Sequence, residues 1–74
     1  MATTPPPGCD EAKTNIDWVI FRDSGARETF NGRIRQGDSA YDAVIYAQGH
    51  NSHAQQTIQV CHTWAKKYLS ELGF

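Results

Sequence analysis

Apolar residues spaced three and four positions apart run through the C-terminal part of the chain. They are Ile58, Cys61, Ala65, Tyr68 and Leu72. This spacing places their side chains along one face of a single amphipathic helix. Ser52 predicts the N-cap of this helix, with Gln55 three positions later as in a capping box. Gly73 predicts its end, with Phe74 folded back on the last turn. The rest of the chain must therefore cover a long apolar face.

Two β-strands are predicted upstream, over residues 15–23 and 27–35. The centre of the first is rich in aromatic and β-branched residues, which are typical of strands. In the second, Phe30 and Ile34 alternate with arginines, so one face is apolar and the other is charged. Residues 23–26 are turn formers, which makes the pair a hairpin.

The first segment has an alternative interpretation as a helix starting at Asp10. Apolar residues at helical spacing support it: Ala12, Ile16, Val19 and Ile20. A second short helix is predicted from Ser39, its N-cap, to about Gln48, and Gly49 ends it.

The predicted fold class is α+β, a β-hairpin or short antiparallel sheet packed against two C-terminal helices. Residues 15–74 would form this single small domain, and residues 1–14, with three consecutive prolines, a disordered or loosely docked arm. The predicted core joins two sets of side chains. The helical set is Ile58, Trp64, Ala65, Tyr68, Leu69 and Leu72, and the set from the strands is Trp18, Ile20, Phe30 and Ile34.

The location expected from the sequence is the cytoplasm. The longest apolar run covers only residues 18–21, too short to cross a membrane, and no secretory signal is apparent at the N-terminus. The two cysteines, Cys9 and Cys61, can form one disulfide at most, and an intracellular protein favours two thiols.

The sequence predicts no enzyme, no metal site and no cofactor. Four candidate ligands fall close together, namely His50, His53, Cys61 and His62. On one helix, however, His53 and His62 point to roughly opposite sides. Cys61 and His62 diverge as sequence neighbours, so they form no nucleophile–base pair. Asp38 and Asp42 are explained by the dipole of the helix that they precede or begin.

The arginines are the main candidate binding residues. All four lie between residues 22 and 35 of a chain whose net charge is −1: Arg22, Arg27, Arg33 and Arg35. On a two-stranded ribbon, three of them would project from one face. Guanidinium groups suit the recognition of carboxylates and phosphates. The cluster therefore predicts a contact surface for an acidic protein patch or a nucleic-acid backbone, and a solvated face is the alternative.

One part of the sequence resembles the hairpin-to-helix pattern of some small phage-encoded anti-CRISPR proteins. It comprises residues 22–25 and 32–38, followed by a predicted helix that bears Ala40, Ala43 and Ala47. The resemblance implies a compact, non-enzymatic inhibitor that occupies a surface of a CRISPR effector. The expected function is thus a small binding protein that inhibits or modulates a larger protein complex. A nucleic-acid-binding regulator that uses the arginine-bearing ribbon is the alternative, and a self-associating module is a third.

Overall fold

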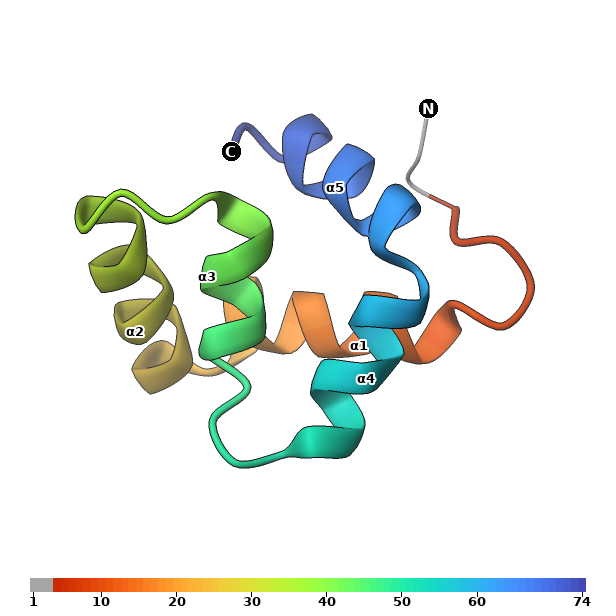
Figure 1. Ribbon diagram of the computed structural model, residues 1–74, viewed down its shortest axis with the longest axis horizontal. Helices are drawn as coiled ribbons and strands as arrows, with labels where there is room; N and C mark the ends of the chain where they lie inside the picture. Colours follow the sequence, from red (N-terminus) through yellow and green to blue (C-terminus); the bar gives the residue numbers. More distant parts are fainter. Residues whose placement is uncertain (1–3) are drawn as a thin grey trace.

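The structure, a computed structural model, describes residues 4–74, and all regular secondary structure in these residues is helical (Figure 1). The elements are α1 (Asp10–Asp17), the π-helix η1 (Trp18–Arg22), α2 (Ser24–Arg35), α3 (Ala40–Tyr46), α4 (Ser52–Val60) and α5 (His62–Glu71). The prediction of an α+β fold was wrong, since residues 4–74 contain no strand or hairpin. Helix α1 lies behind α3 and α4, and α2 packs beside α3.

Helix α2 occupies the segment that was predicted as a turn and a strand. Asp23 is its N-cap, and the carboxylate Oδ1 accepts a hydrogen bond of 3.0 Å from the backbone N–H of Ala26. Gly37 ends it with a positive φ of 101°, and the N–H of Asp38 bonds to the carbonyl of Arg33. A cap at each end therefore converts a strand-like pattern into a helix.

Residues 15–23 form α1 and η1 rather than a strand, which confirms the alternative of a helix from Asp10. The apolar residues at helical spacing, Ala12, Ile16, Val19 and Ile20, are all buried. The last turn is wider than an α-helical turn, because the N–H of Asp23 bonds to the carbonyl of Trp18, five positions earlier. The tendency of the aromatic and β-branched residues toward strands is overridden by burial of one helical face.

The predicted short helix from Ser39 is confirmed as α3, whose N-cap hydroxyl accepts a hydrogen bond from the N–H of Asp42. The prediction of one long helix after it was wrong. Asn51, not Ser52, caps α4, and the helix breaks at Cys61 before α5 begins. Helix α4 packs on α1, whereas α5 packs on α3. The two halves of the predicted helix therefore run in different directions. The predicted stop at Gly73 is confirmed, with a φ of 99°.

Cys9 and Cys61 form a disulfide, so the expectation of two thiols was wrong. The bond ties the residue before α1 to the break between α4 and α5. Residues 10–14 of the predicted arm lie in α1, and Ala12 is fully buried there. Residues 1–3 of that arm lie outside the described residues. The sequence allowed only this pairing, and the expected intracellular location was what favoured thiols.

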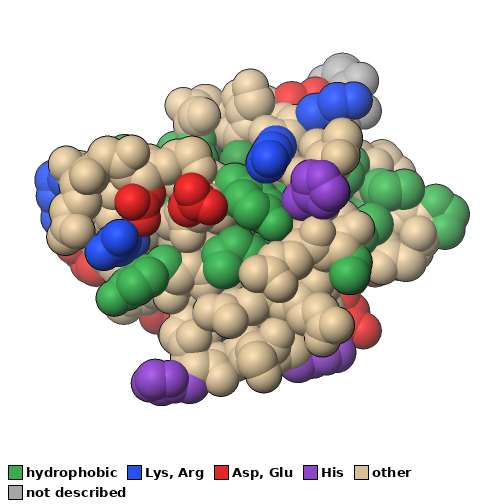
Figure 2. Space-filling model, in the orientation of Figure 1, with side chains coloured by type: hydrophobic (Ala, Val, Ile, Leu, Met, Phe, Trp, Pro, Cys, Tyr) green, Lys and Arg blue, Asp and Glu red, His purple; other side chains and the backbone are tan. Residues whose placement is uncertain are grey.

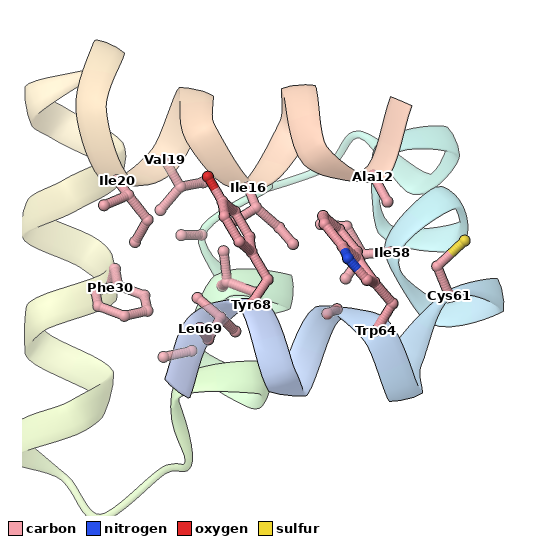
Figure 3. Close-up of a cluster of buried hydrophobic side chains, with 14 of the residues drawn as sticks. Ala12, Ile16, Val19, Ile20, Phe30, Ile58, Cys61, Trp64, Tyr68 and Leu69 are labelled. Atoms are coloured by element: carbon pink, nitrogen blue, oxygen red, sulfur yellow. The ribbon is translucent and has the colours of Figure 1, made fainter. Parts of the chain in front are cut away.

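The core gathers one apolar face from each helix (Figure 3). The predicted C-terminal residues Ile58, Trp64, Ala65, Tyr68 and Leu69 are buried, and Leu72 is partly buried. Ile20 and Phe30 are buried as predicted. Trp18 and Ile34 were predicted in the core, but each is 38% exposed. A helical turn points Trp18 to roughly the opposite side from Ile20, two positions later, whereas Ile34 shares its side of α2 with Phe30 but lies in the last turn of the helix.

Tyr68 links α5 to α1 through its hydroxyl, which donates a hydrogen bond of 2.5 Å to Oδ1 of Asp17. Burial raises the pKa of Tyr68 above its ordinary value of 10.0, and the hydrogen bond to Asp17 raises it further. Lys13 reaches the same carboxylate at 2.7 Å. The folded state therefore favours the neutral phenol beside an ion pair.

We expect the free energy of unfolding to fall as the pH rises above about 10, where the unfolded chain ionises its tyrosines before the folded chain can ionise Tyr68. The contribution is complete below the unfolded pKa and is lost as the pH passes the folded one. Denaturant titrations of the wild type and of Tyr68→Phe at pH 8 and near pH 11 measure it. Tyr41 and Lys13, whose pKa values are also raised, stay in both proteins. An identical pH dependence in the two proteins would contradict the assignment.

Candidate protein-interaction surface

The structure separates the four predicted arginines into two groups. Arg22 ends η1 and Arg27 lies in the first turns of α2, whereas Arg33 and Arg35 lie at the other end of α2. Along a helix, Arg27 and Arg33 are about 9 Å apart in rise and about 120° apart in direction. The single charged face expected from a ribbon is therefore absent from residues 4–74.

The side chain of Arg33 is engaged in contacts within the protein. Its Nε bonds to Oδ2 of Asp38 at 2.8 Å, and this carboxylate raises the pKa of Arg33 above its ordinary value. A second hydrogen bond joins Nη1 to the side chain of Gln36 at 3.1 Å, and the guanidinium lies 4.5 Å from the ring centre of Tyr46. Arg33 thus joins α2 to α3, while Arg35 is exposed nearby.

Arg27 joins three parts of the chain at the other end of α2. Its Nη1 donates a hydrogen bond of 3.2 Å to the carbonyl of Ile20, and its Nε donates one of 3.0 Å to Asn31. The guanidinium also lies 5.2 Å from the ring centre of Phe74 and 5.7 Å from that of Phe30. These contacts fix the half-buried guanidinium in one position between η1 and the C-terminus.

Two large aromatic side chains are exposed on the single turn of η1. Phe21 is 63% exposed, although it directly follows the residue whose carbonyl Arg27 binds, and Trp18 is 38% exposed. Arg22 is exposed four positions after Trp18, which places both on one side of the turn. We call this region the η1 surface: Trp18, Phe21, Arg22, Arg27 and the 42% exposed Phe74.

Aromatic residues and arginine are the types enriched at the energetic centres of protein interfaces. The carboxylate next to Arg22 in sequence, that of Asp23, accepts a hydrogen bond at Oδ1 from the backbone N–H of Ala26. Phe74 meets the buried Phe30 edge to face, with ring centres 5.0 Å apart. The η1 surface therefore combines exposed apolar area with guanidinium groups on a framework anchored to the core.

The face over α3 and α5 has no comparable gathering of charge (Figure 2). Its Lys and Arg side chains lie at separate places, and two acidic side chains lie close together toward its left side. Lys66 on α5 sits 5.2 Å from the ring centre of Tyr41. This face thus lacks the continuous basic track that a nucleic-acid backbone needs.

The metal and nucleophile candidates do not converge. Within residues 4–74, no three His, Cys, Asp or Glu side chains are arranged to hold a metal ion. His53 instead lies 2.9 Å from the carboxylate of Glu11, at the exposed surface. Both cysteines are used in the disulfide, and Asp38 pairs with Arg33. No helix formed by the described residues is long and apolar enough to span a membrane.

Comparisons with protein-family models, with curated proteins and with solved structures gave no match. The assignment of the η1 surface as a candidate interaction site therefore rests on its geometry alone. Sequence reasoning had selected Arg22 and Arg27 but not Trp18, Phe21 and Phe74, which it placed in a strand or against the last helix. The signal that could have found them is the helical spacing of the apolar residues from Ala12 to Ile20. In a helix with that face buried, Trp18 and Phe21 point outward.

Proposed function

We propose that this chain is a non-enzymatic binding protein that modulates a larger protein complex through its η1 surface. The observation that carries the proposal is the turn that exposes Trp18 and Phe21 beside Arg22 and the fixed Arg27. Exposed aromatic rings gathered in one patch favour a partner, because burying each one gains free energy in proportion to the apolar area removed from water.

The partner that fits best is a protein surface with an apolar pocket rimmed by carboxylates. Phe21 supplies the apolar side chain, and Arg22 supplies a guanidinium that can bond both oxygens of one carboxylate. Arg27 is already ordered by Ile20, Asn31 and Phe74, so its contact with a partner costs little side-chain entropy. A CRISPR effector is one partner of this class, although the hairpin on which the anti-CRISPR resemblance rested is a helix in this structure.

A nucleic-acid backbone is the less favoured partner. It would need several cations along one track, whereas Arg33 is engaged by Asp38 and points away from Arg27. A nucleic-acid complex would lose affinity steeply as salt is raised. Complexes dominated by the rings of Trp18 and Phe21 would lose much less.

Photo-crosslinking in cells that make the protein tests the surface directly. Benzoylphenylalanine at position 21 replaces a ring that is 63% exposed, and the matched control is the same residue at position 60, where Val60 on α4 is 70% exposed. We expect one dominant protein adduct from position 21 and none of that mass from position 60. Adducts of equal yield from both positions, or adducts to nucleic acid, would contradict the proposal.

The cytoplasm remains the proposed location, and the disulfide sets a condition on it. Disulfides are rare in cytosolic proteins, where those present are usually transient and take part in redox chemistry. In a cytoplasmic binding protein, the Cys9–Cys61 bond would belong to this exchanging class.

A further inference from the structure

The Cys9–Cys61 disulfide forms part of the wall of a hollow on the surface of the described residues. The hollow has a volume of about 750 Å³, and both cysteines line it together with Val60, His62, Thr63 and Lys67. In Figure 3, the sulfur of Cys61 points away from the labelled core side chains. Both cysteines are buried, with 8% of each residue exposed, and they line the hollow, so a reactant reaches the disulfide from that side.

Both cysteines occupy the same position relative to a helix. Cys9 is the N-cap residue of α1 and Cys61 that of α5, and neither side chain caps its helix with a hydrogen bond. A thiolate released at either position would lie at the positive end of a helix dipole, next to N–H groups that lack an intrahelical partner. Such positions stabilise a thiolate.

The charges around the two helix starts differ. The first turn of α1 carries Asp10 and Glu11, which repel a thiolate on Cys9. The first turn of α5 carries no acidic residue, and Lys67 lines the same hollow, with Glu71 as its one carboxylate. Cys61 is therefore the better leaving group of the pair, and leaving-group stability directs an incoming thiolate to Cys9, against the repulsion from Asp10 and Glu11.

We propose that the Cys9–Cys61 bond is a thiol–disulfide exchange site for a protein dithiol. One thiolate of the dithiol attacks Sγ of Cys9, forming a mixed disulfide, and the electron pair of the broken bond leaves on Sγ of Cys61. The second thiol of the dithiol then attacks the dithiol sulfur that is bonded to Cys9. A disulfide forms within the dithiol, and Cys9 leaves as a thiol. The chain gains two electrons and two protons, and the dithiol becomes a disulfide.

The oxidised wild-type protein provides the main test. It is treated under native conditions with reduced glutathione, and free thiols are then trapped with iodoacetamide and mapped by mass spectrometry. We expect glutathione on Cys9 and the alkyl group on Cys61 in clear excess over the reverse pattern, at a rate faster than global unfolding. Reduction no faster than unfolding, or adducts divided equally between the cysteines, would overturn the proposal.

The single variants Cys9→Ser and Cys61→Ser supply a second readout. Each leaves one thiol at the N-cap of its helix, so their comparison isolates the surrounding charge. We expect Cys61 in the first variant to be alkylated about tenfold faster at pH 7 than Cys9 in the second. Equal rates in folded variants, verified by circular dichroism, would contradict the assigned leaving group.

Discussion

Replacing both Cys9 and Cys61 with alanine is expected to lower the free energy of unfolding by about 4 kcal/mol. The bond joins residues 52 positions apart, and a cross-link of this span removes much of the entropy of the unfolded chain. Both side chains are buried and small, so alanine leaves the packing nearly intact. Urea denaturation of the oxidised wild type and of the double variant measures the difference.

Reduced wild-type protein is the control for that substitution. It keeps both sulfur atoms and lacks only the bond, so its free energy of unfolding should match that of the double variant. A loss below about 1 kcal/mol in both would mean that the N-terminal segment is held by packing alone.

Phe30→Ala is expected to cost about 3–5 kcal/mol, because it empties the largest fully buried side-chain site in residues 4–74. The ring has no exposed surface, contacts Phe74 edge to face and lies under Arg27. Its loss removes the contact between α2 and the C-terminus. Thermal and urea denaturation both report the change.

Ile34→Ala is the matched control, because it truncates an apolar side chain one turn further along the same side of α2. The predicted sheet would have buried both Phe30 and Ile34 in the core, and both substitutions would then be severe. In helix α2, Ile34 is 38% exposed, so its truncation should cost clearly less than that of Phe30. Equal losses for the two variants would contradict the burial pattern of α2.

The C-terminal half of the fold was readable from the sequence because its signals agree with one another. The capped helix at Ser39, the apolar stripe through Tyr68 and the stop at Gly73 all appear in the structure. The break at Cys61 was hidden, because the stripe runs on through it with unchanged period. Only the packing of α4 and α5 on different partners requires the break.

The N-terminal half was misread where local preference and tertiary burial disagree. The run of residues 18–21 resembles a strand, yet its burial follows a helical face that starts at Ala12. For α2, the decisive signals were its caps, Asp23 and Gly37, which also fit turns. Helix caps and turns use the same residue types. The useful clue was the separation of Asp23 and Gly37 along the chain, which fits the two ends of one helix.

The candidate site was predictable in composition but not in arrangement. The arginines at 22 and 27 were identified, but the helix separates them from Arg33 and Arg35, which a ribbon would have aligned. The contribution of Phe74 required the tertiary contacts that bring the last residue onto Arg27 and Phe30. Sequence spacing carries no information about a contact of that range.

Two charge-reversed variants of this chain test the central claim most directly. The measurement is the affinity of each variant for the partner protein that is crosslinked through position 21. Arg22→Glu and Arg35→Glu make the same change at exposed arginines on different parts of the helical surface. We predict that Arg22→Glu raises the Kd at least about tenfold, as at interface centres, whereas Arg35→Glu changes it less than about twofold. Equal effects of the two variants, with both still folded, would contradict a contact site centred on η1.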